Sequence, residues 1–136
     1  MRTVYADALY YIALLLPGDQ LHAASLTIGA ELSNSRVVTC EPVLVEVLAH
    51  VSGLGPVARA RAVALVDLLR GDLPTTDVIP QTPELFEDGL ILYRRRLDKG
   101  YSLTDCMSMS ICRRFAITEV LTHDRHFEQE GFAILL

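Results

Sequence analysis

The sequence alternates short, uniformly apolar runs with longer helical stretches, and this alternation restricts the fold more than any other feature. The runs that predict strands are residues 3–6, 36–39, 77–79, 119–121 and 133–136. The stretches that predict helices are residues 8–16, 20–33, 41–51, 57–70, 82–97 and 104–115. Strands that are apolar on both faces and separated by helices are typical of parallel sheets covered on both sides. The predicted fold class is therefore α/β, a three-layer α/β/α sandwich with a central, mainly parallel sheet.

The helix predicted over residues 82–97 has the clearest pattern. Phe86, Leu90, Tyr93 and Leu97 recur on one stripe, as in an amphipathic helix. Its acids come early and its arginines, residues 94–96, come late, which is the order that the helix dipole favours.

Length and composition favour one domain that spans residues 1–136. A hydrophobic fraction of 51% is enough to build a core without disulfides or structural metals. The formal net charge of −5 excludes a generally basic, nucleic-acid-coating surface, because such binding needs an excess of lysine and arginine.

The cysteines and the hydropathy of the sequence indicate the cellular compartment of the protein. Cys40, Cys106 and Cys112 are odd in number and lie in apolar runs without metal-ligand spacing, so we expect buried thiols in a reducing compartment. Asp7 interrupts the only apolar stretch that could serve as a secretory signal, and no run approaches the roughly 18 apolar residues of a membrane span. We expect a soluble, cytoplasmic protein.

Four acids stand where a parallel sheet would bring them together. Asp7 directly follows the first predicted strand, and Asp124 follows the strand at 119–121 after a short turn. Asp105 lies in the first turn of its helix, whose amino end would meet the same sheet edge. Glu46 lies among apolar residues of a helix, where an isolated charge is costly. Because ligands bind beyond the carboxyl ends of such strands and Mg²⁺ takes oxygen ligands, these acids predict a cation site.

Each acid also has a purely structural explanation. Asp7 could cap the helix that follows it. Residues 102–105 (SLTD) could form a capping box. Asp124 could be an ordinary turn residue, and Glu46 could pair with His50 one helical turn later. Only the joint placement of the four acids favours the cation site.

At these positions the sequence resembles the PIN domain family of ribonucleases. The resemblance is carried by residues 5–9 (YADAL), 45–48 (VEVL), 101–106 (YSLTDC) and 121–127 (LTHDRHF), followed by Gly131 and Phe132. Order and spacing match over essentially the whole chain. One departure is that Ala8 and Leu9 follow the first acid, where many relatives carry Thr and then Ser or Asn. A hydroxyl that could support metal or phosphate binding is therefore missing.

The resemblance implies an Mg²⁺-dependent endoribonuclease in which Asp7, Glu46, Asp105 and Asp124 are both the catalytic residues and the metal ligands. Asp7, Glu46 and Asp105 would hold one or two Mg²⁺ (or Mn²⁺) ions, and Asp124 would complete the set directly or through water. Phosphodiester hydrolysis by metal-activated water would leave 5′-phosphate and 3′-hydroxyl ends, with Asp105 or Asp124 accepting the proton.

Single-domain members of this length are usually VapC-like toxins of type II toxin–antitoxin pairs. That likeness implies a homodimer that cleaves RNA and is neutralised by a small antitoxin protein whose tail enters the active-site groove. Two further functions remain open. One is a catalytically silent PIN-fold module for binding or scaffolding, and the other is a metal-dependent phosphoesterase or nuclease acting on another substrate.

Neighbouring residues suggest supporting roles. Thr104 and Thr122 flank two of the acids and could hydrogen-bond to them, or could simply cap local turns. The basic strip of residues 94–96 and Lys99 could contact an RNA backbone or could be a solvated helix end. His123 and His126 flank Asp124, but they match no zinc spacing and Mg²⁺ prefers oxygen, so a ligand role is disfavoured.

Overall fold

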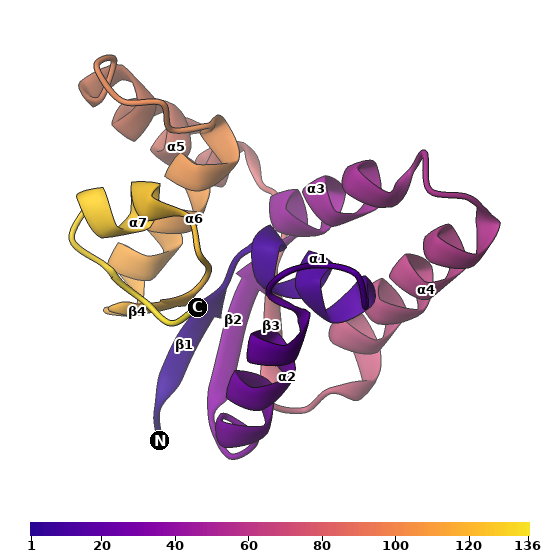
Figure 1. Cartoon of the computed structure of the whole chain (residues 1–136). Coiled ribbons are helices and arrows are strands. Elements are labelled where there is room, and N and C mark those ends of the chain that lie inside the picture. Colours follow the sequence, from indigo (N-terminus) through magenta and orange to yellow (C-terminus); the bar gives the residue numbers. More distant parts are fainter.

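The computed structural model describes the backbone of residues 1–136 and every side chain except that of Asp72. Figure 1 shows the arrangement of the elements. In chain order they are β1 (Thr3–Ala6), α1 (Ala8–Leu15), α2 (His22–Glu31), β2 (Arg36–Cys40), α3 (Glu41–Val51), α4 (Pro56–Asp67), the π-helix η1 (Leu68–Asp72), β3 (Thr76–Ile79), α5 (Pro83–Arg95), α6 (Leu103–Arg114), β4 (Glu119–Leu121), α7 (Arg125–Gln129) and β5 (Ala133–Ile134).

The five strands form one sheet in the order β3-β2-β1-β4-β5, and every neighbouring pair is parallel. On the central strand, Tyr5 lies opposite Val38 on one side and Val120 on the other. Helices cover both faces of the sheet (Figure 1). The predicted α/β/α sandwich is therefore confirmed.

The direction of the crossovers determines which helices cover which face. From β1 the chain moves outward through β2 to β3, and it then returns across the sheet to β4 and β5. Because parallel crossovers are right-handed, α1 to α4 lie on one face and α5 to α7 on the other, as Figure 1 shows. The reversal takes place between β1 and β4. In open parallel sheets the crevice at such a reversal is the usual ligand site.

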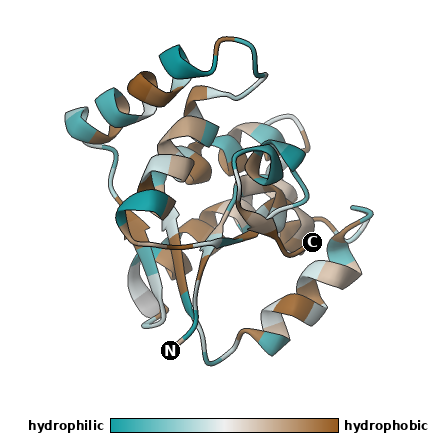
Figure 2. Cartoon of the chain, turned by 90° about the vertical axis from the view of Figure 1, so that its left-hand side faces the viewer, coloured by the Kyte–Doolittle hydropathy of each residue, from teal (hydrophilic) through white to brown (hydrophobic). Residues whose placement is uncertain are grey.

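The core lies on both sides of the central strands. Val4, Tyr5 and Ala6 of β1 and Val120 of β4 are fully buried. Each large apolar side chain removed from water in this way contributes about 1.5–3 kcal/mol to folding. In Figure 2 the hydrophilic segments lie mainly at the periphery, around this apolar centre. The core thus fixes the strands whose ends carry Asp7 and Asp124.

Helix α5 begins after Thr82, whose hydroxyl accepts a hydrogen bond of 3.1 Å from the N–H of Leu85. Its buried side chains are Leu85 and Leu92, with Gly89 between them. A Cβ atom on Gly89 would lie 2.5 Å from Cγ and 3.2 Å from the backbone nitrogen of Met107, so only glycine allows α5 to approach α6 this closely.

The apolar stripe of α5 faces outward. Phe86 is 41% exposed and Tyr93 42%, Leu90 is half-buried, and Leu97, which is 78% exposed, lies two residues beyond the end of α5. Amphipathic helices usually turn such a stripe toward the core. In this protein α5 instead packs on α6 through the face that carries Leu85, Gly89 and Leu92, because Gly89 allows the two helices to come close on that side. The stripe therefore remains available to a partner.

Most predicted boundaries agree with the structure, and the strands at 3–6 and 119–121 and the helix at 41–51 agree at both ends. The short helix α7 was missed. The helix predicted over 57–70 begins at Pro56 and continues at its end into η1. The three cysteines are buried free thiols, as expected. Among the described residues, no helix is both long and apolar enough to cross a membrane.

Candidate active site

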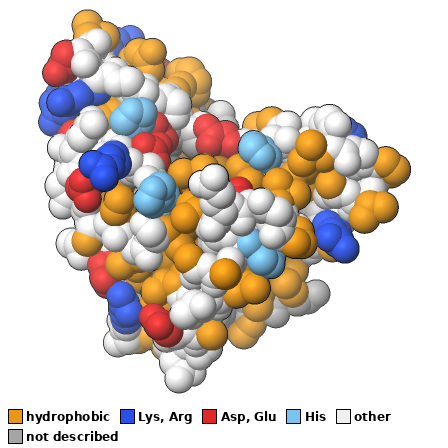
Figure 3. Space-filling view, in the orientation of Figure 1, with side chains coloured by type: hydrophobic (Ala, Val, Ile, Leu, Met, Phe, Trp, Pro, Cys, Tyr) orange, Lys and Arg blue, Asp and Glu red, His pale blue; other side chains and the backbone are white. Residues whose placement is uncertain are grey.

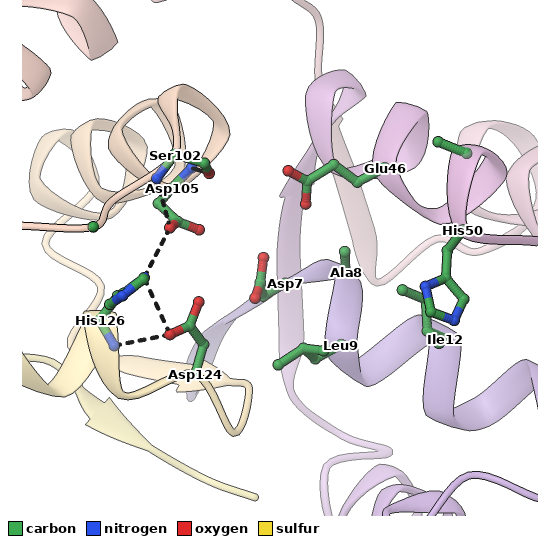
Figure 4. A pocket seen from close by; sticks show the side chains of 12 residues that line it. Asp7, Ala8, Leu9, Ile12, Glu46, His50, Ser102, Asp105, Asp124 and His126 are labelled. Atoms are coloured by element: carbon green, nitrogen blue, oxygen red, sulfur yellow. Dashed lines mark hydrogen bonds and ion pairs between the residues drawn. The ribbon is translucent and has the colours of Figure 1, made fainter.

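A cleft of about 610 Å³ opens at the carboxyl edge of the sheet, beside the reversal between β1 and β4. All four predicted acids line it, together with Ser102, His50 and His126 among others. Figure 3 shows acidic and histidine side chains around a notch in the surface, and Figure 4 shows the side chains that line the cleft. The structure thus brings together residues from β1, α3, α6 and the turn after β4.

Asp7 lies at the end of β1, and its side chain does not cap α1. Instead, the hydroxyl of Thr122 donates a hydrogen bond of 3.0 Å to its Oδ2 atom. The residue is only 4% exposed. Burial, and then the charges of Asp105 and Glu46, raise the pKa of Asp7 to about 7. Ionised Asp7 is therefore costly until a cation compensates for it.

Asp105 lies in the first turn of α6 and forms a capping box with Ser102. The N–H of Ser102 donates to Oδ2 of Asp105, and the N–H of Asp105 donates to Oγ of Ser102, each at 3.0 Å. The capping explanation is therefore correct, but it does not displace Asp105 from the cleft. Burial, with the charge of Asp124, raises the pKa of Asp105.

Asp124 follows β4 and caps the short helix α7, because its Oδ1 accepts a hydrogen bond of 2.9 Å from the N–H of His126. Its own N–H donates to Oγ1 of Thr122 at 3.0 Å. The residue thus has the predicted turn role and also lines the cleft. Asp7, Asp105 and Asp124 each use one carboxylate oxygen for these contacts, while the other has no hydrogen-bond partner among the described side chains.

Glu46 reaches the cleft from α3, on the wall opposite Asp105 and Asp124 (Figure 4). It is half-buried, and burial followed by the charge of Asp105 raises its pKa, while the hydroxyl of Thr104 offsets part of the rise. Among the described side chains Glu46 has no ion pair with His50, so that alternative is not observed.

The sequence disfavours a ligand role for His126, yet the residue lines the cleft beside Asp105 and Asp124 (Figure 4). Its Nδ1 atom lies 3.3 Å from Oδ2 of Asp105 and 3.4 Å from Oδ1 of Asp124. Single donor atoms of these three residues lie within 4.8 Å of one another, the one such group among the described residues. Asp7 and Glu46 stand outside this tight group. His123 is not part of this group, and its Nδ1 atom forms a hydrogen bond of 3.0 Å with the carbonyl of Leu136 instead.

One arginine of the predicted basic strip has a structural role. Arg96 forms an ion pair of 2.8 Å with the carboxylate of Glu130, which also accepts hydrogen bonds from Tyr101 and Arg113. Arg94 and Arg95 are exposed at the end of α5. Arg96 therefore connects the loop before α6 with the end of α7. It is not free to contact RNA in the way that the other residues of the strip could.

A parallel α/β sheet with clustered carboxylates at its reversal point defines a class of proteins suited to bind divalent cations and phosphates. A family model described as PIN domain matches residues 4–132, and the chain belongs to this family. PIN domains are a family of nucleases that use divalent metal ions. No curated protein sequence matches the chain significantly.

Similar solved structures cover the whole fold. VapC20 from Mycobacterium tuberculosis, described as a sarcin-ricin loop cleaving toxin, has a TM-score of 0.84 at 22% identity and covers 96% of each chain. FitAcB from Neisseria gonorrhoeae has a TM-score of 0.63 at 16% identity, covering 98% of this chain and 96% of its own. VapBC2 from Rickettsia felis, bound to a DNA fragment from its promoter, has a TM-score of 0.64 at 12% identity. The match covers 97% of this chain and 96% of the VapBC2 chain.

Proposed function

We propose that residues 1–136 form one domain that acts as a metal-dependent endoribonuclease, the toxin of a type II toxin–antitoxin pair in the cytoplasm. The observation that carries this proposal is the convergence of Asp7, Glu46, Asp105 and Asp124 on one cleft of a PIN fold. VapC20, one of the structural neighbours, is described as a sarcin-ricin loop cleaving toxin.

The donor set suits a hard divalent cation such as Mg²⁺ or Mn²⁺. Asp7, Asp105 and Asp124 each keep one carboxylate oxygen without a described hydrogen-bond partner, and Glu46 faces them. Burial and mutual repulsion raise the pKa of Asp7, Glu46 and Asp105, which is the electrostatic cost that a bound dication removes. When bound, the ion lowers the pKa of a water and neutralises charge that develops on phosphorus.

The protein residues then position the reactants. Thr122 and Ser102 hold Asp7 and Asp105 in place through their hydrogen bonds. Asp124 is more exposed than Asp105 and can accept the proton of the attacking water. Attack by water on the phosphodiester leaves 5′-phosphate and 3′-hydroxyl ends.

Two exposed cations that neighbour cleft residues in the sequence support a nucleic-acid substrate. Lys99 precedes Gly100, which lines the cleft, and Arg125 follows Asp124. Either side chain could contact the phosphates of a bound strand, and phosphate contacts fix the position of a strand without selecting its sequence. The overall negative charge makes such local cations more important than long-range attraction.

Exposed apolar surface supports two protein partners. The arm formed by α3 and α4 exposes Val45 (62%), Val57 (67%) and Val63 (51%), a surface that apolar residues of a small antitoxin would cover before its tail enters the adjacent cleft. The exposed side chains of Phe86 and Tyr93 on α5 and of Leu97 just beyond it would be covered in a homodimer.

The proposal is tested by incubating the wild type and Asp7→Asn with structured and unstructured RNA, with Mg²⁺ or Mn²⁺ and with a chelator. We expect metal-dependent cleavage by the wild type and at least a hundred-fold lower rate for Asp7→Asn, since about 2.7 kcal/mol of transition-state stabilisation corresponds to that factor. Asp67→Asn, an exposed site on α4, is the matched control and should cleave normally.

Parallel incubations separate the alternatives. Cleavage of DNA or of small phosphoesters, but not of RNA, would assign the same site to another substrate. Equal cleavage by the wild type and Asp7→Asn would show a contaminating nuclease. No metal-dependent cleavage of any substrate would indicate a catalytically silent binding or scaffold module.

A further inference from the structure

The imidazole of His126 points between two carboxylates of the cleft (Figure 4). Its Nδ1 lies 3.3 Å from Oδ2 of Asp105 and 3.4 Å from Oδ1 of Asp124. Strong hydrogen bonds between a charged nitrogen donor and a carboxylate are about 2.7–2.9 Å long. Both contacts are longer than that, and one Nδ1–H cannot point at both oxygens. The contact with Asp105 is a long hydrogen bond, and it leaves the approach of Nδ1 to Asp124 unexplained.

Metal coordination explains the spacing better. Ligands at about 2.1 Å from an octahedral ion stand about 3 Å apart when they are neighbours on the ion. The two distances from Nδ1 are close to this value, and all three donor atoms lie within 4.8 Å of one another. An ion could therefore contact Nδ1 and one oxygen of each carboxylate after a rearrangement of these side chains.

The surrounding residues hold the ring in this orientation. The backbone N–H of His126 donates to Oδ1 of Asp124 at 2.9 Å, which fixes the start of α7. The ring of Tyr101 packs against the imidazole with centroids 5.3 Å apart. The other nitrogen, Nε2, lies beside Gly100, where a Cβ atom would be 3.5 Å away. With Nε2 on the Gly100 side, Nδ1 is the nitrogen that faces the carboxylates of Asp105 and Asp124.

We propose that Nδ1 of His126 is a direct ligand of the cation held by Asp105 and Asp124, and that the site consequently prefers Mn²⁺ to Mg²⁺. Mg²⁺ takes oxygen ligands almost exclusively, whereas an imidazole raises affinity for first-row transition ions. This inference rests on the metal site of the proposed function. It adds a nitrogen ligand to the four acids and predicts the ion that the protein selects.

Pulsed EPR on the full-length protein with bound Mn²⁺ tests the ligand directly. We expect the modulation of a ¹⁴N nucleus bound to Mn²⁺ in the wild type, replaced by a ¹⁵N signal when histidine is ¹⁵N-labelled. His126→Gln should lose the signal. His50→Gln, a second histidine that lines the same cleft, should keep it. Absence of directly bound nitrogen in the Mn²⁺-loaded wild type would overturn the inference without relying on any variant.

Calorimetric titration measures the selectivity. His126→Gln places its amide near the position of Nε2, away from the carboxylates, and should weaken Mn²⁺ binding at least about tenfold while changing Mg²⁺ binding less than about threefold. His126→Asn offers an oxygen near the position of Nδ1, and should retain Mg²⁺ binding while narrowing the Mn²⁺ preference. Tighter binding of either ion by His126→Gln would mean that the imidazole competes with the cation, contrary to the inference.

These readouts are independent of RNA cleavage. Nitrogen-coordinated Mn²⁺ in a protein that cleaves no nucleic acid would contradict the proposed function and leave the ligand assignment intact. Metal-dependent cleavage with Mn²⁺ bound through oxygen alone would support the proposed function and contradict the ligand assignment. Failure to bind either dication would overturn both.

Discussion

Thr122 donates a hydrogen bond of 3.0 Å from its hydroxyl to Oδ2 of Asp7, and so connects the chain after β4 to the end of β1. The hydroxyl oxygen of Thr122, Oγ1, also accepts a hydrogen bond of 3.0 Å from the N–H of Asp124. Thr122 is fully buried. A single hydroxyl group therefore fixes two of the proposed metal ligands relative to each other at the reversal point of the sheet.

Thr122→Val removes this hydroxyl and preserves the shape of the side chain. Asp7 loses a donor and the N–H of Asp124 loses an acceptor, so we expect kcat for RNA cleavage to fall by about 10- to 100-fold at saturating metal, with little change in KM. The free energy of unfolding should fall by about 1–3 kcal/mol, because a buried N–H is left unpaired. Steady-state kinetics and urea denaturation measure these effects.

Thr122→Ser is the control, since it retains the hydroxyl and should keep most of the activity. Wild-type kcat in Thr122→Val would show that Asp7 does not depend on this contact for its position.

Asp7→Asn should stabilise the metal-free protein although it abolishes activity. Burial first, and then the charges of Asp105 and Glu46, raise the pKa of Asp7 to about 7 in the folded protein. Because the unfolded chain ionises near pH 4, stability conferred by the protonated form is lost as the pH rises from about 4 to beyond 7. At pH 8 in chelator we expect Asp7→Asn to raise the free energy of unfolding by about 1–3 kcal/mol.

Thermal denaturation with and without Mn²⁺ tests this electrostatic account. Added Mn²⁺ should raise the Tm of the wild type and have a smaller effect on Asp7→Asn. A variant less stable than the wild type in chelator at pH 8 would argue that Asp7 contributes to stability mainly through its contact with Thr122.

Glu130 should make the protein sensitive to acid. Burial acts to raise the pKa of Glu130, but hydrogen bonds from Arg96, Tyr101 and Arg113 outweigh it and hold the pKa below its usual value. The folded pKa is therefore lower than the unfolded one, so the stabilisation is complete above about pH 4.5 and is lost as the pH falls through the folded value.

Glu130→Gln should cost about 2 kcal/mol of unfolding free energy at pH 7, since charged hydrogen bonds of this kind contribute that much. Urea denaturation at pH 7, 5 and 3.5 should show a difference between the wild type and the variant that is smaller at pH 3.5 than at pH 7. An unchanged difference at pH 3.5 would mean that the ionised carboxylate is not the stabilising form.

The apolar stripe of α5 should mediate self-association. Leu97→Glu places a charge at its most exposed position, 78% exposed, and should shift the protein from dimer to monomer in analytical ultracentrifugation without lowering its Tm. Val57→Glu on α4 is the matched control, because Val57 is similarly exposed and lies on the surface that we propose for the antitoxin. Dimers of equal affinity in both variants would place the interface elsewhere.

The sequence was sufficient to predict the sheet and the elements that carry the four acids. Apolar strands and their separation by helices are local properties, so the positions of Asp7 and Asp124 at the carboxyl edge followed directly. The outward orientation of Phe86 and Tyr93 could not be predicted, because it depends on how closely Gly89 lets α5 approach α6. That approach is a property of two helices packed together rather than of one.

The place of His126 was also beyond the sequence. Its spacing from Asp124 matches no metal motif, and α7, which orients it, is only five residues long. Its proximity to Asp105 depends on a contact between α6 and α7 across 21 positions of the chain. A cap residue followed two positions later by a histidine was the only available signal, and it is common in ordinary turns.

The most direct test of the central claim is anomalous diffraction from crystals of the protein soaked in Mn²⁺. The account predicts a Mn²⁺ peak in the cleft, about 2.1–2.3 Å from carboxylate oxygens of Asp105 and Asp124, with Asp7 and Glu46 as direct or water-bridged ligands. Crystals that show no anomalous peak in this cleft, at a Mn²⁺ concentration that supports RNA cleavage in solution, would contradict it.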